Sequence, residues 1–301
     1  MKRLIKIGTR KSPLALIQTN IVVKALKEYN NDIEVELVPM STKGDELLDV
    51  SLSSFGGKGA FISEFEEALI QGRIDLAVHS AKDMPIELPD GLDIVAVSRR
   101  EDPRDVIITR KGSNIALSEK SIVGTSSLRR QMQIQEQYHV QVKLLRGNVN
   151  TRLNKLKNKE YDAIILAAAG LKRLDKNEGT EYNFEYLGID TFIPAAGQGI
   201  IAVEGRKDKE IVMMLDGFNN EETFYSLQTE REVLRLLNAG CNEPIGVYSC
   251  IRNEQIELNI IFGHEDRIIR QSGTALLNDR FKLANELSHN ILLKLPSYRV
   301  V

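Results

Sequence analysis

Three stretches of the sequence combine hydroxyl side chains with arginine or lysine where a strand gives way to a helix. The free backbone N–H groups of a helix N-terminus attract anions, and arginine pairs with a carboxylate or phosphate through two parallel hydrogen bonds. One such stretch is also what an ordinary capped helix contains. Three of them at the carboxyl ends of parallel strands predict a site for an anionic ligand. The stretches are TRKS (Thr9–Ser12), GTSSLRR (Gly124–Arg130) and LRGNVNTR (Leu145–Arg152).

The stretch VHSAKDMP (Val78–Pro85) sets one carboxylate, that of Asp83, directly after Lys82. It follows the apolar run Ile74–Val78, so Asp83 falls where a buried strand is expected to end. As one alternative, Asp83 is a cap or turn residue, with Pro85 ending the element. As the other, its carboxylate faces the cationic turns, stays ionised and is aimed at the ligand that enters the cleft.

Two loops carry further reactive or cationic groups. FGGKGAF (Phe55–Phe61) holds Lys58 without the spacing of a P-loop or a dinucleotide fingerprint, and is either a cover over an anionic ligand or a plain surface loop. NAGCNEPIG (Asn238–Gly246) holds Cys241 between glycine and proline, where a thiol acts as a nucleophile or an attachment point. Most lone cysteines are instead small buried hydrophobic residues, and Cys250 in VYSCI fits that description better.

The elements that must position these groups alternate between short β-branched runs and longer helical patterns, which predicts parallel α/β architecture. Ile5–Gly8 reads as a strand followed by a helix with Ser12 as N-cap and Pro13 in its first turn. Ser121–Gly124 reads as a second strand; Thr125, Ser126 and Ser127 then offer caps for a helix that begins at Leu128. The first helix takes its apolar spacing from Leu14, Ile17, Ile21, Val22 and Leu26.

Two pairs of similar stretches indicate two similar lobes. IGTRKS resembles VGTSSL, and RIDLAVHSAKD resembles EYDAIILAAAG, where Asp75 and Asp162 each precede a buried strand. The charged stretch Ser98–Asp105 is expected to link the lobes. The glycine-rich stretch Ile193–Gly199 is a second crossing that leads into the apolar run Ile200–Val203; if that run returns to the first sheet, two adjacent segments join the lobes.

The predicted fold class is therefore α/β, with two doubly wound lobes and a smaller α+β domain at the C-terminal end. The first lobe is expected at residues 1–98 with 198–217, the second at 104–193 and the third domain at 221–301. The third domain begins with a helix over Glu222–Leu237, continues with the Cys241 loop and strands, and ends with a helix near Phe281–Leu293.

Composition excludes several classes of partner. The chain has 301 residues, with 40 Lys and Arg against 42 Asp and Glu, so its net charge of -2 gives no overall attraction to nucleic acid or anionic membrane. It has no Trp and 6% aromatic residues, too few for platforms that stack bases. Two cysteines and four histidines show no metal-ligand spacing, so no metal is expected. The opening MKRLIKIGTR reads as a strand and not as a signal peptide, and a cytoplasmic location is expected.

Taken together and in order, these stretches resemble the porphobilinogen deaminase (hydroxymethylbilane synthase) family. The resemblance covers nearly the whole chain, and its strength lies in the ordered set. It runs through GTRKSPLAL, GGKGAF, DLAVHSAKDMP, REDPRD, GTSSLRRQ, LRGNVNTRL, YDAIILAAAGLKRL, PAAGQG and the cysteine loop.

The family resemblance implies two periplasmic-binding-protein-like lobes and a third domain that carries a covalent dipyrromethane cofactor. It implies a transferase that adds four porphobilinogens in turn, each losing ammonia, and releases linear 1-hydroxymethylbilane by hydrolysis for tetrapyrrole and heme biosynthesis. Loss of ammonia places positive charge on a pyrrole nitrogen, and a carboxylate near that nitrogen stabilises it. The acetate and propionate groups of each pyrrole bring negative charge, which the cationic turns balance.

By the same resemblance, Asp83 is the catalytic carboxylate and Cys241 the thioether attachment point. The implied cofactor-binding residues are Lys82, Ser127, Arg129, Arg130 and Arg146. The implied substrate-binding residues are Arg10, Ser12, Arg152, Arg173 and, in the glycine-rich cover, Lys58.

The sequence departs from the family pattern in two places. Ser54 stands where many members carry a lysine before the glycine-rich loop, which leaves the cover with less charge. Around the cysteine, members commonly read GGC followed by Gln or His, whereas this chain has Ala239 before Gly240, and Asn242 and Glu243 after Cys241.

A different class of protein also fits the lobes: a two-lobed carboxylate-binding or regulatory protein without catalysis. Asp83 and Cys241 discriminate, because a pure anion binder uses neither. The expected partner is the small molecule porphobilinogen, with no nucleic acid and no membrane. The chain is expected to be a monomer that passes its product to a downstream tetrapyrrole enzyme.

Overall fold

The computed structural model describes residues 2–30, 32–41, 63–113, 116–176, 181–239, 243–265 and 267–295. The stretch Phe55–Phe61 with Lys58, and the residues Ser54, Gly240, Cys241 and Asn242, lie outside these ranges. The chain divides into two compact units, Met1–Glu101 with Gly199–Tyr225 and Asp102–Gln198 with Ser226–Val301. The chain therefore crosses from one unit to the other three times, after Glu101, after Gln198 and after Tyr225.

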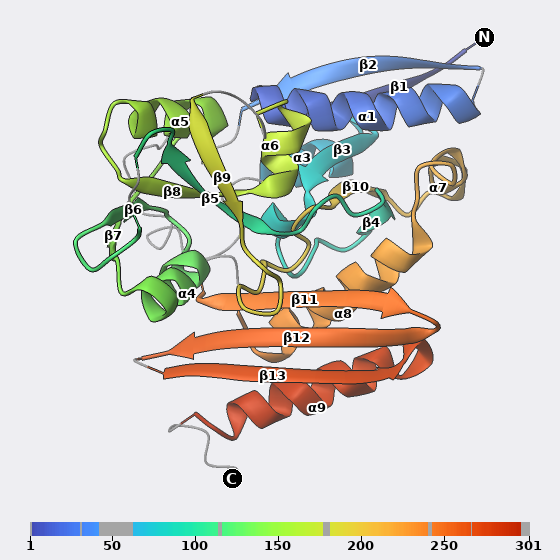
Figure 1. Cartoon of the computed structure of the whole chain (residues 1–301). Helices are drawn as coiled ribbons and strands as arrows, with labels where there is room; N and C mark the ends of the chain where they lie inside the picture. The colour runs from blue at the N-terminus through green and yellow to red at the C-terminus, as the bar shows by residue number, and fades with distance from the viewer. Residues whose placement is uncertain are drawn as a thin grey trace. The chain divides into compact units, whose positions relative to one another are not determined.

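The first unit is built on a five-stranded sheet of order β2-β1-β3-β10-β4 (Figure 1). Strands β2, β1 and β3 are parallel, and β10 runs antiparallel to both of its neighbours. β10 therefore returns to the first sheet, as the sequence predicts. The strands are β1 (Arg3–Arg10), β2 (Ile33–Met40), β3 (Leu76–Ser80), β4 (Leu92–Val97) and β10 (Ile201–Arg206), and the helices are α1 (Pro13–Tyr29), α3 (Ser63–Ile70), the 3-10 helix η2 (Ala81–Asp83) and α7 (Lys209–Met214).

Helices cover both faces of this sheet because its strands are apolar on both sides. Val78 faces the cluster formed with α1 and α7, whereas its neighbour Ala77 faces the cluster under α3. Adjacent strand residues point to opposite faces, so β3 is buried on both. This places β3 at the centre of the unit, with its carboxyl end next to the start of α1.

Ser12 caps α1 as predicted: its Oγ accepts a hydrogen bond from the N–H of Ala15, and Pro13 is the first helical residue. The buried stripe of α1 differs from the apolar spacing in the sequence, since Ile21 is 40% exposed. Gln18 and Thr19 are buried instead, because the Gln18 amide donates to Ser80 Oγ and the Thr19 hydroxyl donates to Thr9 Oγ1. The stripe comprises Ala15, Gln18, Thr19, Val22 and Leu26.

The second unit contains a sheet with the equivalent order, β7-β6-β8-β5-β9. Three parallel strands are again followed by one antiparallel strand and an edge strand. Helices α5 and α6 pack on one face, and α4 packs on the other. The strands are β5 (Asp105–Arg110), β6 (Ile122–Gly124), β7 (Gln141–Lys143), β8 (Ala163–Ala167) and β9 (Tyr182–Tyr186), and the helices are α4 (Leu128–Tyr138), α5 (Val149–Lys157) and α6 (Ala168–Arg173).

One contact recurs in both sheets and supports their likeness. The carboxylate of Asp75 accepts the Lys6 N–H at 2.9 Å, and that of Asp162 accepts the Ile122 N–H at 2.8 Å. An arginine at the end of the antiparallel strand lies beside each carboxylate: Arg206 Nη2 is 3.0 Å from Asp75, and Arg110 Nη2 is 4.0 Å from Asp162. The similar stretches of sequence thus hold equivalent positions in the two sheets.

The C-terminal part of the second unit is a three-stranded antiparallel sheet, β11-β12-β13, with helices packed on it (Figure 1). Val233 of α8, Leu237 just after it and Leu287 of α9 share one apolar cluster with the sheet. The elements are α8 (Glu221–Leu236), β11 (Ile245–Arg252), β12 (Gln255–His264), β13 (Arg267–Leu276), the 3-10 helix η3 (Leu277–Asp279) and α9 (Arg280–Leu292).

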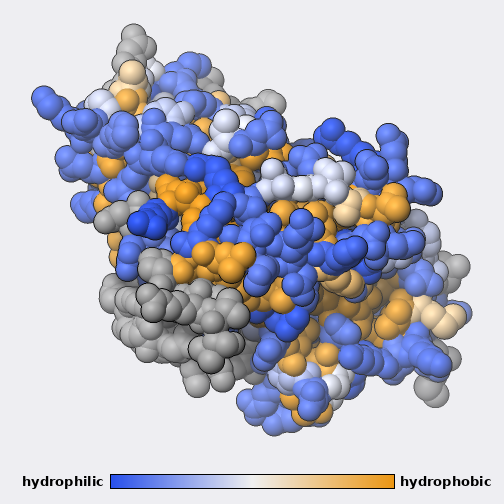
Figure 2. Space-filling model, turned by 90° about the horizontal axis from the view of Figure 1, so that it is seen from below, coloured by the Kyte–Doolittle hydropathy of each residue, from blue (hydrophilic) through white to orange (hydrophobic). Residues whose placement is uncertain are grey.

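On the face shown in Figure 2, hydrophilic residues are widespread among the described residues, and hydrophobic ones lie between them. None of the helices described is both long and apolar enough to cross a membrane. Within the same ranges, no group of three or more His, Cys, Asp or Glu side chains is arranged to hold a metal ion.

Candidate active site

Asp83 ends the short 3-10 helix η2 that follows β3, beside the N-terminus of α1. It helps to line a pocket of about 80 Å³ in the first unit, together with Arg10 and Ser12. The Gln18–Ser80 hydrogen bond, 2.9 Å long, fixes α1 against the end of β3 and so sets the spacing across the pocket. Three of the residues singled out in the sequence, Arg10, Ser12 and Asp83, are thus brought together.

The Asp83 carboxylate does not serve as a cap. The residue is exposed, and η2 has Ser80 at its N-cap position. Among the described residues, the Asp83 side chain makes no hydrogen bond and no ion pair. The preceding Lys82 is partly buried and has interactions of its own. An exposed carboxylate on the wall of a pocket can accept hydrogen bonds from donors of a bound ligand.

A buried acid–base pair lies beneath this pocket, and sequence reasoning missed it. His79 Nε2 lies 3.0 Å from Glu204 Oε2, and the two side chains are 4% and 0% exposed. Burial, with the nearby Glu204 charge, raises the pKa of Glu66 on α3 to about 7. One sequence signal could have revealed this pair: His79 in VHS and Glu204 in AVEGR are polar residues inside otherwise apolar strands.

In the second unit, the cationic turns follow the carboxyl ends of the parallel strands β6 and β7. Ser127 is the N-cap of α4 and accepts the Arg130 N–H, and Asn148 is the N-cap of α5 and accepts the Thr151 N–H. Arg152 Nε donates to the Gly147 carbonyl at 2.7 Å. Arg146 is partly exposed beside that turn, and Arg173 ends α6, the helix after β8.

Arg129 and Arg130 are buried, and both bind a carboxylate that the sequence had placed in the linker. Asp105 is fully buried as the first residue of β5; its Oδ2 lies 2.6 Å from Arg129 Nη1 and its Oδ1 2.7 Å from Arg130 Nη2. Burial opposes ionisation of Asp105, but the two guanidinium groups hold its pKa well below the ordinary range. Gln198 Nε2 completes the cluster with a 3.0 Å bond to Oδ1.

The cysteine loop itself lies outside the described residues, but both of its ends are fixed within the second unit. On one side, Ala239 is buried after α8. On the other, Gly246 of β11 packs on the Ile193 carbonyl so closely that a Cβ atom would lie 2.7 Å from that oxygen. The buried Glu230 of α8 accepts the Gly197 N–H at 2.7 Å, which ties the helix to the PAAGQG crossing.

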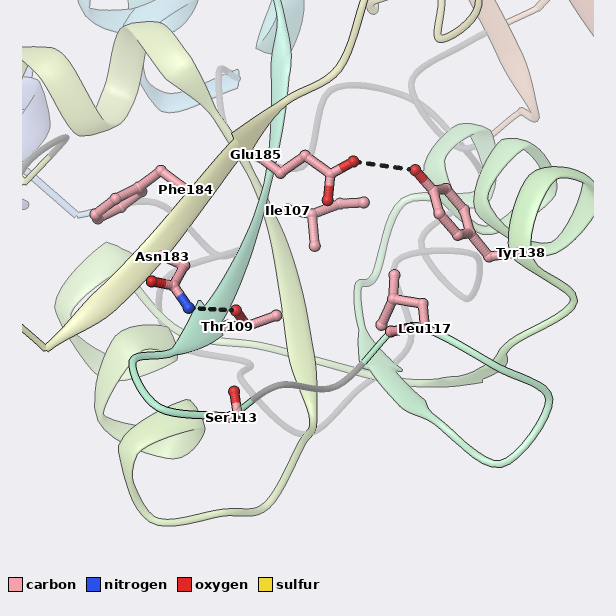
Figure 3. A pocket seen from close by; sticks show the side chains of 9 residues that line it. Ile107, Thr109, Ser113, Leu117, Tyr138, Asn183, Phe184 and Glu185 are labelled. Carbon is pink, nitrogen blue, oxygen red and sulfur yellow. Dashed lines mark hydrogen bonds between the residues drawn. The ribbon is translucent and has the colours of Figure 1, made fainter.

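Another pocket, of about 410 Å³, lies on the second sheet and has other lining residues (Figure 3). Tyr138 donates to Glu185 at 3.2 Å across it, and burial, with the Glu185 charge, raises the pKa of Tyr138. Thr109 and Asn183 line the same pocket. The residues that line this pocket include neither arginine nor lysine, so it differs from the cationic turns.

These features define a class: an α/β protein of two similar lobes, each with cationic, hydroxyl-bearing turns at the carboxyl ends of its parallel strands, and a smaller α+β domain. The chain belongs to the porphobilinogen deaminase family. Residues 5–214 match the family's dipyromethane cofactor binding domain, and residues 224–296 match its C-terminal domain. The porphobilinogen deaminase of Alkaliphilus metalliredigens is 41% identical over 297 residues, which cover 97% of this chain and 93% of that protein.

Two solved structures, a periplasmic domain and a substrate binding domain, match part of the chain with low TM-scores. The periplasmic VFT2 domain of Bordetella pertussis BvgS gives a TM-score of 0.44 at 16% identity, over 74% of this chain and 88% of that domain. The second substrate binding domain of a putative amino acid ABC transporter from Streptococcus pneumoniae gives 0.44 at 16% identity, over 72% and 92%. The fold assignment itself rests on the strand orders given above.

The family and the α/β fold class predicted from the sequence are confirmed. The family matches also confirm the predicted hydroxymethylbilane synthase function, the enzyme class of transferase and the dipyrromethane cofactor. They give no support to the alternative of a carboxylate-binding protein without catalysis.

Proposed function

We propose that this chain performs the porphobilinogen deaminase reaction with Asp83 as its catalytic carboxylate and Cys241 as the attachment point of the cofactor. One observation carries the proposal: Asp83 lines a pocket with Arg10 and Ser12 at the end of β3. A carboxylate beside a guanidinium and a helix N-terminus suits a substrate whose carboxylates are anionic and whose ring nitrogen becomes positive during reaction.

In this pocket, Arg10 and the N-terminus of α1 bind carboxylate groups of porphobilinogen, and Ser12 donates a hydrogen bond to the same groups. Asp83 accepts the pyrrole N–H. When ammonia leaves the substrate, the positive charge on that nitrogen is offset by the Asp83 carboxylate. The further residues proposed for substrate binding are Arg152, Arg173 and Lys58.

The residues of the second unit fit the cofactor that the family name describes. A group with several carboxylates suits an edge where helices α4 and α5 begin and where the first turn of α4 carries two arginines bound to Asp105. When bound, the dipyrromethane supplies the pyrrole carbon that is joined to the substrate. The residues proposed to hold it are Cys241, Lys82, Ser127, Arg129, Arg130 and Arg146.

The function is tested by incubating the purified protein with porphobilinogen and measuring ammonia and hydroxymethylbilane. The proposal predicts one ammonia per porphobilinogen consumed and one tetrapyrrole for every four. Tight binding of porphobilinogen without release of ammonia would refute catalysis and leave only a binding protein.

We propose the three-part division predicted from the sequence, with the third domain carrying the cofactor cysteine. The contacts between Glu230, Gly197 and Ser249 support a cofactor domain that is tied to the second crossing. We also propose that the protein is a cytoplasmic monomer whose product goes to a downstream tetrapyrrole enzyme.

A further inference from the structure

The imidazole of His79 has one ring nitrogen bound and one without a partner. Its Nε2 lies 3.0 Å from Glu204 Oε2, and the Phe65 ring packs edge-on against it with 5.2 Å between the ring centroids. Within the described ranges, His79 Nδ1 makes no hydrogen bond. His79 is also one of the residues that line the pocket of Asp83. The ring is therefore fixed on one side and borders the pocket.

The pairing of β3 with β10 explains why these two side chains meet. His79 lies opposite Ala202, and Glu204 lies opposite Ala77. Diagonal neighbours of this kind lie on the same face of a sheet, here the face that α3 covers. Glu204 is fully buried there, and its Oε1 accepts no hydrogen bond among the described residues. The contact with His79 is thus the one that supports this carboxyl group.

Glu204 acts on its surroundings as a carboxylate. Burial, with the Glu204 charge, raises the pKa of Glu66 on α3 to about 7. An ionised Glu204 accepts the hydrogen of His79 Nε2, which leaves a lone pair on Nδ1. Other charged groups on the surrounding strands are engaged elsewhere: Arg206 with Asp75, Asp93 with Lys207, and Arg10 within the pocket and its own contacts.

The proposed reaction has a proton to move. In each condensation a C–N bond breaks and its electron pair leaves with ammonia, while a new C–C bond forms at a ring carbon. That carbon gives up its hydrogen as a proton, and the electron pair of the C–H bond returns to the ring. The proton departs with the ammonia as ammonium, so no further reactant is needed. A base beside the pocket must hold the proton in the interval.

We propose that His79 is this base, taking up the proton through Nδ1 and returning it to ammonia, and that Glu204 is its positioning residue. Glu204 orients the ring through Nε2 and offsets the positive charge that the imidazole gains with the proton. The inference rests on the proposed function, because it names a further residue for that reaction. Asp83 keeps the role proposed above, at the ring nitrogen of the substrate.

Two variants test these roles, with one matched control. They are His79→Gln and Glu204→Gln, and the control is Asp75→Asn. Asp75 directly precedes β3 and binds Arg206 at the end of the strand away from the pocket. Its replacement therefore removes a charged contact from the same sheet without touching His79. Each protein is measured for melting temperature, and for kcat and KM as functions of pH.

His79→Gln should lower kcat about 10²-fold and leave KM within about twofold of wild type, because the base acts on a proton and not on binding. Glu204→Gln should lower kcat at least about tenfold. Its melting temperature should be no lower than that of the control, since the imidazole left behind can be neutral. A purely structural role would instead lower the melting temperature and leave kcat near wild type, as expected for Asp75→Asn. A kcat within about threefold of wild type in either variant would overturn the proposal.

NMR of histidine-labelled protein observes the ring without the reaction. The chain has four histidines, and the other three, His139, His264 and His289, lie in the second unit and serve as internal references. In wild type, Nε2 should carry a hydrogen throughout, and Nδ1 should gain one over the pH range in which kcat falls. Both changes should move to lower pH in Glu204→Gln, because the protonated ring loses its counter-charge. A hydrogen on Nδ1 over the whole active pH range would contradict the role of His79.

The same measurements separate this inference from the proposed function. Wild-type protein that releases no ammonia from porphobilinogen would refute the proposed function and this inference with it. Normal release of ammonia by wild type and equally by His79→Gln would refute this inference alone.

Discussion

Replacing Asp83 by asparagine should separate catalysis from stability. The change keeps the size of the side chain and removes its charge. Asp83 is exposed at the end of η2, away from the buried clusters of the first unit. Its replacement should therefore change the free energy of unfolding by no more than about 0.5 kcal/mol.

The loss of rate follows from the charge that Asp83 is proposed to offset. Two unit charges about 4 Å apart interact by about 4 kcal/mol at an effective dielectric near 20 and by about 1 kcal/mol in bulk water. Asp83 lines a pocket of about 80 Å³, so the bound substrate excludes much of the water. At about 1.4 kcal/mol for each factor of ten, kcat should fall about 10²–10³-fold. KM should change little, because the nitrogen is positive only during reaction.

The assay is steady-state release of tetrapyrrole, together with urea unfolding of the same protein. Asp90→Asn is the matched control, since Asp90 is also an exposed carboxylate in the same unit. Near-normal kcat in Asp83→Asn would remove this carboxylate from the mechanism. A loss of kcat that is matched by a loss of stability would assign it a structural role instead.

Three further predictions concern buried or strained positions. Asp105→Asn should cost about 3 kcal/mol of unfolding free energy by urea denaturation, because it leaves two buried guanidinium groups without their counter-charge; a loss below about 1 kcal/mol would contradict the cluster. Gly199→Ala should cost more than about 1 kcal/mol, since Gly199 has φ of +90° and an added Cβ would lie 2.3 Å from the Glu101 carbonyl, whereas Gly188→Ala, with 3.6 Å to its nearest neighbour, should be close to neutral. Burial raises the pKa of Glu66 from 4.5 to about 7, so folded protein holds a proton that the unfolded chain loses, and stability should decline as pH rises from about 4.5 to 7. Glu66→Gln should flatten that decline by about 1 kcal/mol, allowing for partial exposure, and an unchanged pH profile of unfolding would refute the shift.

Local sequence signals predicted the elements well. Ser12 and Ser127 both lie where a polar residue precedes a helical pattern, and both cap the helix that follows. A cap depends on three or four consecutive residues, so the sequence alone contains the information. The return of β10 to the first sheet was also predictable, because a glycine-rich crossing precedes a short apolar run.

The contacts between distant residues could not be predicted in the same way. Asp105 stands in a charged stretch that reads as a linker, yet it is buried because Arg129 and Arg130 reach it from α4. The buried stripe of α1 was misjudged for a similar reason, since Gln18 is buried by its bond to Ser80 and not by hydrophobicity. In both cases the polar partner lies more than twenty residues away, beyond the reach of periodicity.

The most direct test of the proposed chemistry is the intact mass of the purified protein. A covalent cofactor predicts a mass above that of the sequence by two porphobilinogens less two ammonias, and the loss of this excess in Cys241→Ser. Wild-type protein that stays at its sequence mass, even after incubation with porphobilinogen, would contradict the covalent cofactor and, with it, the proposed mechanism.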